Sequence, residues 1–363
     1  MKIVIVHKSS ISSFPPILSL IDVLFSLGVE IHIICGEDNS EFLSDLRTKC
    51  KEIHVIPYSN YSGKIGKIIT WLNVRKKFWS LIIKHSYEKE LIWIPTADTT
   101  LALGKKLLKY RFILNIYELF DTFPRYKNGL EIFAKRAKVV VCPEITRAHI
   151  FKSWWNLKDL PVVLPNKPYF INREKFRPLP SEIQNIINKI KESNKKIAIY
   201  QGILTQDRGL DSLCKAFNFN KNFALILMGK ETKLSKQLLI NYPNIFYIPF
   251  ILPPYHLNIT SHANIGVLSY DNSSLNNIFC APNKIWEYSG IGLPMLGNEI
   301  PGLINVIENK KIGKTVNFEH VDRINEALDE LDKKYESYCE NSYNFFDSVD
   351  IKDVIQKILI KAM

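Results

Sequence analysis

The sequence predicts an α/β protein built from two tandem, doubly wound parallel sheets. Its 363 residues are too many for one ordinary core and fit two domains of about 150 residues each. Short apolar runs alternate with helix-length segments, which is typical of parallel sheets with both faces covered. Between two such series, the stretch PYFINREKFRPLPSEIQ is rich in proline and charge and indicates a linker that leads into a helix.

In the first half, local signals mark the expected elements. Residues 2–7 (KIVIVH) are a nearly continuous apolar run and predict the first strand. Residues 15–28 predict a helix, because proline stands at the start and glycine at the end. Residues 29–35 predict the second strand. Further strands are expected at 52–57, 91–95, 111–117, 138–143 and 161–166.

The second half repeats the pattern. Strands are expected at 195–202, 222–229, 244–249, 263–270, 293–297 and 312–316. The predicted domains are therefore 1–170 and 171–345, with 346–363 as a C-terminal helix that packs back on the N-terminal domain. Ligands of such sheets bind at the carboxyl ends of the strands.

Composition points to a reducing compartment. Hydrophobic residues make up 46% and charged residues 23% of the chain, as in ordinary globular proteins. The segment MKIVIVHKSS is too short an apolar run for a signal peptide, and no window approaches 18 uninterrupted apolar residues. Six cysteines are scattered without CxxC spacing, which favours buried free thiols. We expect a cytoplasmic protein.

Positive charge is concentrated in the first half. Residues 1–170 carry 25 Lys and Arg against 15 Asp and Glu, so nearly all of the net charge of +12 lies there. Either an anionic partner or a general preference for lysine could explain this excess.

Residues 63–85 combine basic and aromatic side chains, which suits an amphipathic helix on the anionic inner face of the plasma membrane. They are Lys64, Lys67, Arg75, Lys76, Lys77 and Lys84 with Trp71, Phe78 and Trp79. The alternative is an ordinary crossover helix that covers the sheet. Nucleic acid is not expected, because no nucleic-acid-binding motif accompanies the charge.

The stretch CAPNKIWEYSGIGLPMLG (280–297) combines a cation and a carboxylate in one structural unit. Pro282 suits the first turn of a helix, and the following glycines end that helix before a short strand. Lys284 therefore stands at a helix start, where anions bind, and Glu287 lies one turn further on.

The stretch APNKIWEYSGIGLPMLGNEIPGLINVIENKKIGKTV (281–316) resembles the donor-binding region of GT-B glycosyltransferases. The likeness is to the retaining family 4, or "group 1", enzymes. Residues 197–217, 162–170 and 115–124 resemble further segments of that family in the same order. The resemblance implies two Rossmann-like domains that face a central cleft and a retaining transfer of sugar from a nucleotide-sugar donor.

The resemblance also implies site residues. Glu287 matches the family's ribose-binding glutamate, and a carboxylate can accept both ribose hydroxyl protons. Lys284 and Arg208, the latter expected to open the helix after the Gly202 turn, would meet the charge of the leaving diphosphate. Further donor contacts are expected from Gly202, Asn283, Ile285 and Asn277. A UDP-sugar is favoured over a GDP-sugar.

On the acceptor side, Asp121 and Glu118 follow a predicted strand, and Asp121 would orient the sugar or the acceptor. The alternative for Asp121 is a helix-capping role. His7 also ends a strand and could face the cleft.

Three features depart from the family pattern. Phe279 stands where many members have a second glutamate, Ile203 replaces a basic residue after Gly202, and HKSSISSF (7–14) replaces a glycine pair. Asp271, Asn276 and Asn277 are the polar groups left to contact a sugar.

Other catalytic motifs are absent from the sequence. DELD (329–332) lies in a helical charge run, and there is no HExxH, P-loop or GxSxG motif, so no metal is expected. The favoured function is a retaining glycosyltransferase that extends glycan or lipid-linked acceptors in bacterial surface polysaccharide synthesis. The alternative is a non-catalytic GT-B-like subunit that binds a partner enzyme or a glycan. An inverting transferase or a nucleotide-sugar epimerase also fits the fold.

Overall fold

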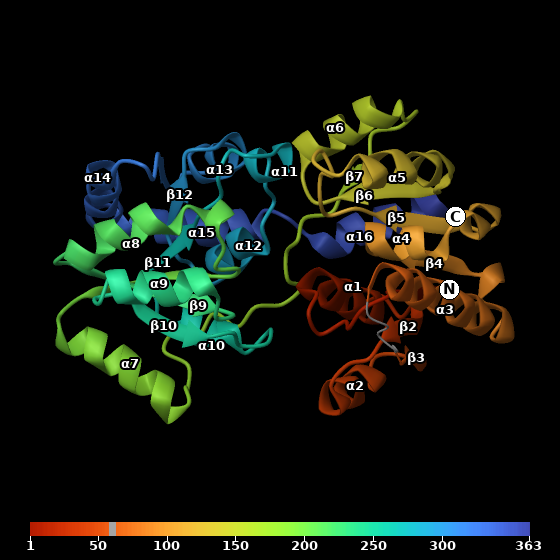
Figure 1. Cartoon of the computed structure of the whole chain (residues 1–363), viewed down its shortest axis with the longest axis horizontal. Coiled ribbons are helices and arrows are strands. Elements are labelled where there is room, and N and C mark those ends of the chain that lie inside the picture. The colour runs from red at the N-terminus through yellow and green to blue at the C-terminus, as the bar shows by residue number, and fades with distance from the viewer. Residues whose placement is uncertain (58–62) are drawn as a thin grey trace. The chain divides into compact units, whose positions relative to one another are not determined.

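The computed structural model describes residues 1–57 and 63–363, without the side chains of Ser40 and residues 63–68. The chain divides into two compact units (Figure 1). Unit 1 comprises Met1–Tyr169 and Asp350–Met363, and unit 2 comprises Phe170–Val349.

Unit 1 contains a parallel sheet whose described strands have the order β3-β2-β1-β4-β5-β6-β7. Its first crossover shows how the sequence sets the boundaries. Helix α1 begins at Pro15, where a missing N–H costs nothing, and ends at Ser26 before Gly28, whose φ of +67° suits a residue without Cβ. The strands are β1 (Lys2–Val6), β2 (Glu30–Gly36), β3 (Glu52–Ile56), β4 (Leu91–Ile94), β5 (Phe112–Asn115), β6 (Val139–Cys142) and β7 (Val162–Val163).

Helices cover this sheet, and the last helix of the chain is one of them. Helix α16 (Ile351–Ala362) packs against α1 and β6, and the Arg111 guanidinium donates a hydrogen bond to the Ala362 carbonyl at 3.2 Å. The other helices of unit 1 are α2 (Ser40–Arg47), α3 (Gly63–Lys84), α4 (Ala97–Leu103), α5 (Pro124–Arg136) and α6 (Ile145–Trp155), with 3₁₀ turns η1 (Tyr87–Lys89) and η2 (Lys105–Lys109).

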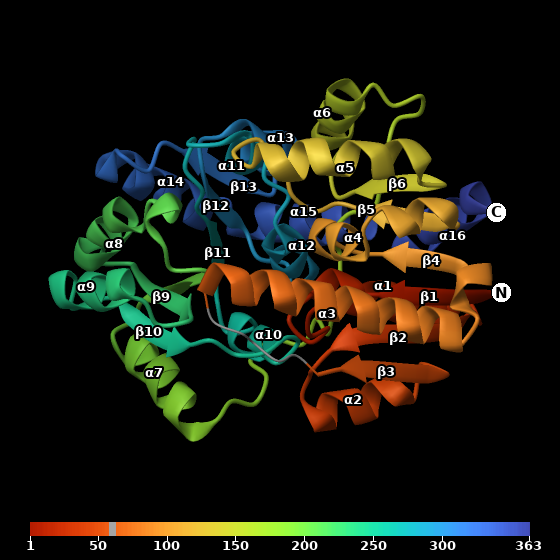
Figure 2. The same cartoon turned by 45° about the vertical axis from the view of Figure 1, so that its right-hand side comes forward.

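Helix α3 lies along one face of the sheet and packs against α4 and β3 (Figure 2). Phe78 and Trp79 are buried, and the Trp79 indole N–H donates to the Leu103 carbonyl at 2.9 Å. Arg75 donates to the carbonyls of Leu101 and Ala102. Trp79, one of the aromatic residues expected on a membrane-facing helix, therefore faces the protein interior, because its ring belongs to the α3–α4 contact.

Unit 2 contains a second parallel sheet, whose described strands have the order β10-β9-β8-β11-β12-β13. The chain runs outward from β8 in both directions, so β8 and β11 flank the point where the strand order reverses. Open α/β sheets bind ligands at such switch points. The strands are β8 (Lys196–Gln201), β9 (Phe223–Gly229), β10 (Phe246–Pro249), β11 (Ile265–Leu268), β12 (Met295–Asn298) and β13 (Gly313–Val316).

Alternating side chains of β8 enter different cores. Ile197 and Ile199 belong to one buried cluster, whereas Ala198 and Tyr200 belong to the other. Both faces are covered, which confirms the predicted doubly wound fold class. The helices are α7 (Ser181–Glu192), α8 (Leu210–Phe219), α9 (Lys233–Asn241), α10 (His256–Thr260), α11 (Leu275–Ile278), α12 (Asn283–Gly290), α13 (Pro301–Ile307), α14 (Val321–Lys333) and α15 (Tyr335–Asp347), with the 3₁₀ turn η3 (Gln206–Arg208).

All six cysteines are described, and none forms a disulfide. Five are buried, and burial raises the pKa of Cys35 and Cys142 to about 12. Such thiols are inert packing groups.

Candidate functional site

The loops that follow β8 and β11 are joined by hydrogen bonds. The Asp271 N–H donates to the Asp207 carbonyl at 3.0 Å, and the Ser269 hydroxyl donates to the Arg208 carbonyl. Two loops at the switch point of unit 2 therefore form one connected rim.

Tyr288 fixes helix α12 against the ends of the same two strands. Its buried hydroxyl donates to the Ile199 carbonyl at 3.1 Å and lies 3.4 Å from the Val267 carbonyl. The ring fills the space above Gly266, where a Cβ would lie only 2.3 Å from a ring carbon. Because this contact sets the position of the helix, it also sets the positions of Lys284 and Glu287, which precede Tyr288 on α12.

Glu287 is a buried carboxylate, 6% exposed, that is held by a glutamine and a histidine. The Gln201 amide donates to its Oε2 at 2.5 Å, and His256 Nε2 lies 3.4 Å from the same oxygen. Thr260 in turn donates to Gln201 Oε1 at 2.7 Å, which fixes the orientation of the amide. No hydrogen bond reaches Glu287 Oε1 within the described part of the chain, so this oxygen can accept from a ligand hydroxyl.

Lys284 lies against aromatic rings rather than a carboxylate. Its Nζ is 4.4 Å from the centre of the Tyr200 ring and 5.4 Å from that of Tyr270. Burial and, next, the charge of Arg208 lower the pKa of Lys284 to about 7, although the charge of Glu287 opposes this shift. An anion beside this ammonium would raise the pKa again.

Gly202 leaves space for the side chain of Lys284. The residue ends β8 with a φ of +143°, and an added Cβ would lie 3.2 Å from Lys284 Nζ. Glycine is therefore required both for the backbone conformation and for the close approach of the ammonium.

Arg208 supplies a second cation to the rim. Its guanidinium carbon is 4.2 Å from the centre of the Tyr270 ring, and its Nε is 3.4 Å from Asp207 Oδ2. The buried Nη1 has no hydrogen-bond partner among the described residues. The expectation that Arg208 opens a helix is wrong: it ends η3, and Gly209, with φ +55°, separates it from α8.

The remaining donor-side candidates have different surroundings. Asn277 is buried and donates to Asp271 Oδ1 at 2.7 Å, so its amide supports that carboxylate. Burial alone would raise the pKa of Asp271, but hydrogen bonds from Ser273 and Asn277 and the charge of Arg208 outweigh it and lower the pKa.

Ile285 and Asn283 both lie in the first turn of α12. Ile285 is 3% exposed, and its side chain belongs to the hydrophobic core. Asn283 is the first residue of the helix and is half-buried. Asn276, on α11, and Phe279, the residue after that helix, are half-buried as well.

In unit 1, Glu118 and Asp121 follow the carboxyl end of β5. The Glu118 side chain is 56% exposed, and its Oε2 lies 3.5 Å from Nη1 of the buried Arg147. Arg147 also donates to the Tyr117 carbonyl, which fixes it below the loop. The N-cap of the next helix, α5, is Phe123, so Asp121 is not its N-cap residue.

His7 directly follows β1 and is enclosed by the protein. The side chain is 1% exposed, its ring packs edge-on against Phe14, and neither ring nitrogen has a hydrogen-bond partner within residues 1–57 and 63–363. Burial is the main cause that lowers the pKa of His7 to about 4, so the imidazole is neutral at physiological pH.

Comparisons with known proteins agree on the fold. No protein-family model and no curated protein matches the sequence. Among solved structures, Anabaena HepE in complex with UDP and glucose matches with a TM-score of 0.73 and 15% identity, over 99% of this chain and 98% of HepE. Sucrose-phosphate synthase from Thermosynechococcus elongatus matches with a TM-score of 0.67 and 14% identity, over 100% and 96% of the two chains. Trehalose-6-phosphate synthase OtsA matches with a TM-score of 0.69 and 11% identity, over 100% and 99%.

The chain has the GT-B fold. The predicted resemblance is thereby confirmed at the level of the fold. Within this GT-B chain, the rim of unit 2 brings together Gly202, Arg208, Lys284 and Glu287, as their places in the sequence suggested.

The sequence analysis did not identify the residues that hold these four site residues in place. Gln201 and Tyr200 end a predicted strand, so a search for polar side chains at strand ends could have found them. His256 and Thr260 belong to the short helix α10, and no sequence signal connects them to Glu287.

Proposed function

We propose that this protein transfers a glycosyl group from a nucleotide-sugar donor to an acceptor. One observation carries the proposal: a buried carboxylate and two cations lie together at the switch point of a doubly wound sheet. Such a combination suits a ligand that has both vicinal hydroxyls and a diphosphate.

Each group has a distinct task in this proposal. Glu287 accepts hydrogen bonds from the ribose hydroxyls through Oε1, while Gln201 and His256 hold Oε2. Lys284 and Arg208 meet the diphosphate, whose negative charge grows as the glycosidic bond breaks. Fixed cations in a partly dry site stabilise such developing charge strongly. Gly202 lets the backbone approach the phosphates.

The proposed donor is a UDP-sugar. HepE was solved with UDP and with UDP-glucose, and the E. coli trehalose-6-phosphate structure was solved with UDP-2-fluoro glucose. We propose that the two cations neutralise the leaving diphosphate without a metal ion.

We further propose retention of anomeric configuration. In front-face attack the leaving phosphate oxygen takes the acceptor's proton, so a strong protein base is not needed. Asp121 and Glu118 would then orient the sugar or the acceptor. The acceptor class we propose is a glycan or a lipid-linked glycan of the bacterial surface, extended at the inner face of the plasma membrane.

Helix α3 is the proposed membrane contact. Its exposed side chains include Ile69, Trp71, Leu72, Lys76 and Ile83, which combine apolar and basic character. Lys64 and Lys67 lie outside the residues whose side chains are described. In the described part of the chain, no helix is long and apolar enough to cross a bilayer.

Sedimentation with vesicles of graded anionic lipid content tests this contact. Binding should weaken at high salt and in the double variant Lys76→Glu/Lys84→Glu, since each basic residue contributes about 1 kcal/mol near an anionic surface. The matched control, Lys138→Glu/Lys152→Glu, changes the net charge equally on other elements of unit 1 and should retain binding. Equal loss in both variants would contradict a specific role for α3.

A non-catalytic subunit is the second candidate. Phe279 occupies the position of a glutamate in many GT-B enzymes, and the exposed Ile203 replaces a basic residue. Such a subunit could retain nucleotide-sugar binding without turnover.

A panel of UDP- and GDP-sugars separates the candidates. Calorimetry measures binding, and release of nucleoside diphosphate, with and without bacterial lipid extract, measures turnover. We expect micromolar to millimolar binding of one UDP-sugar, about −8 to −4 kcal/mol, together with turnover. Binding without turnover would favour the subunit, and no binding by any donor would exclude the transferase. The anomeric configuration of a product, read by NMR, decides retention.

A further inference from the structure

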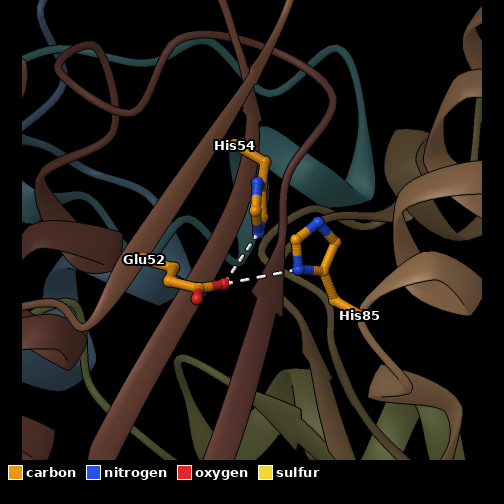
Figure 3. Close-up of side chains that lie close together, drawn as sticks. All are labelled: Glu52, His54 and His85. Carbon is orange, nitrogen blue, oxygen red and sulfur yellow. Dashed lines mark ion pairs between the residues drawn. The ribbon is translucent and has the colours of Figure 1, made fainter.

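Three of the eight histidines of the chain, His32, His54 and His85, lie around the Glu52 carboxylate in unit 1, apart from the residues discussed above. Figure 3 shows two of them, His54 and His85, beside Glu52. Glu52 and His54 are two residues apart on β3, so their side chains project from the same face of the sheet. His85 follows the last residue of α3, the helix that packs on β3. His32, on β2, is the register partner of Glu52.

The distances suit metal coordination. Glu52 Oε2 is 3.2 Å from His54 Nε2 and 3.5 Å from His85 Nδ1, and the three candidate ligand atoms lie within 4.8 Å of one another. Two tetrahedral ligands at about 2.0–2.1 Å from a zinc ion are about 3.3–3.4 Å apart. Small side-chain rotations would therefore bring all three atoms onto one ion.

A network of hydrogen bonds orients the carboxylate. The Tyr87 hydroxyl donates to Glu52 Oε2 at 2.8 Å and lies 2.7 Å from His32 Nδ1. The opposite ring nitrogen of His32 lies 2.7 Å from Glu30 Oε1. Metal ligands in proteins are held by partners of this kind. Tyr87 is buried, whereas the Glu52 side chain is 44% exposed, so an ion could enter from solvent and keep a water ligand.

We propose that Glu52 Oε2, His54 Nε2 and His85 Nδ1 bind a divalent transition-metal ion, Zn²⁺, with water in the remaining position. Two imidazoles and one carboxylate form a common ligand set of zinc sites that keep an open position. Among the described residues, no other group of three His, Cys, Asp or Glu side chains brings its ligand atoms this close.

The directions in which the pKa values of Glu52 and His54 are shifted agree with this assignment. The Tyr87 hydrogen bond is the main cause that lowers the pKa of Glu52, and the nearby histidines lower it further. Burial, and next the charge of His85, lower the pKa of His54, so the neutral imidazole that a metal requires is favoured.

The position of the proposed site in the sheet suggests that the ion stabilises the fold of unit 1. Glu52 and His54 begin β3, so they lie toward its amino end, whereas Glu118 and Asp121 follow the carboxyl end of β5 in the same parallel sheet. An ion there would connect β3 to the end of α3. This inference does not depend on the proposed transferase activity.

Titration of the untagged, full-length, chelator-treated protein with ZnCl₂ tests the site. We expect one equivalent to bind, and Ala at His54 or His85 to weaken binding at least about 100-fold, since even outer partners contribute about 10–100-fold. His149→Ala and His320→Ala remove exposed histidines elsewhere and should leave affinity unchanged. Zn²⁺ should raise the melting temperature of the wild type but not of His54→Ala/His85→Ala.

Two further measurements keep the proposal testable if the alanine variants fold poorly. Tyr87→Phe should fold and weaken Zn²⁺ binding about 10–100-fold by releasing Glu52. Cobalt in place of zinc should give the intense visible absorption of a tetrahedral ion. No binding by the wild type, or equal binding by wild type and by Glu52→Gln/His54→Gln/His85→Gln, would overturn the site and indicate adventitious surface binding only.

Discussion

The carboxyl edges of the two parallel sheets carry different kinds of polar group. In unit 2, Glu287 is buried and held by Gln201 and His256, and Lys284 is confined between aromatic rings. In unit 1, the Glu118 side chain is 56% exposed, and another strand of the sheet, β1, is followed by the neutral, enclosed His7. One edge is rigid and charged, and the other is open.

This difference indicates how specificity is divided. Buried charges cost desolvation free energy in the empty protein, so they are retained where a defined ligand compensates for them. An exposed carboxylate costs little desolvation free energy and can change its orientation, but solvent screens its interactions. Under the proposed function, the edge of unit 2 would suit one constant ligand, and that of unit 1 would suit a variable acceptor.

The largest expected effect concerns turnover and the cations of unit 2. Lys284→Gln and Arg208→Gln should each lower kcat about 100- to 1000-fold, because each removes a fixed charge from the leaving diphosphate. The KM for the donor should rise less than kcat falls. Lys215→Gln, an exposed lysine of α8, is the control. Steady-state kinetics measures both constants, and a change in KM alone would reduce the two cations to ground-state binding.

The next effect separates the two edges directly. Glu287→Gln should weaken donor binding by about 1.5–3 kcal/mol, the usual cost of losing a hydrogen bond to a charged group. The corresponding variant in unit 1, Glu118→Gln, should leave donor affinity unchanged. Calorimetry with the same nucleotide sugar measures both, after circular dichroism has shown that the variants are folded. Equal losses would contradict the comparison.

Donor affinity should fall as pH rises through about 7, where free Lys284 loses its proton. Because its pKa is lowered, the free ammonium is mostly charged only below about pH 7, and an anionic ligand binds the charged form more tightly. Above the pKa, affinity should fall up to about tenfold for each pH unit, because one proton must be taken up on binding.

A nucleotide sugar is the right probe, since it lacks the terminal phosphate that titrates near about pH 6. Lys284→Arg, which stays charged, should flatten the profile between pH 6 and about 8.5. A wild-type profile that is already flat would show that Lys284 does not contact the diphosphate.

The smallest effect is on folding stability. Gln201→Ala should lower the free energy of unfolding by about 1–3 kcal/mol, because it removes the buried amide that bonds to both Glu287 and Thr260. Glu118→Gln should cost less than about 1 kcal/mol, since its carboxylate is exposed. Urea denaturation measures both. A larger loss for Glu118→Gln would mean that the edge of unit 1 is as preorganised as that of unit 2.

Much of the fold could be predicted because its signals are local. The apolar run at β1, the Pro15 start and the Gly28 end of α1, and the alternation of Ile197 and Ile199 with Ala198 and Tyr200 each follow from short-range sterics and burial. Strand β7 shows the limit of such local signals. Residues 161–166 predict a strand of six residues, but only Val162 and Val163 form strand β7. Pairing with β6, rather than hydrophobicity, sets its length.

The sequence by itself determined the fold class and placed a cation and a carboxylate, Lys284 and Glu287, one turn apart on a helix after a loop. Only the tertiary structure decided how buried they are and what holds them. Gln201 and Glu287 are 86 positions apart in the chain, and His54 and His85 meet across a helix and a strand. It also decided that Trp79 of α3 packs inward while Trp71 faces solvent. These outcomes depend on which elements pack together. Desolvation and hydrogen bonds between residues that are distant in the chain produce no repeating pattern that could be recognised in the sequence.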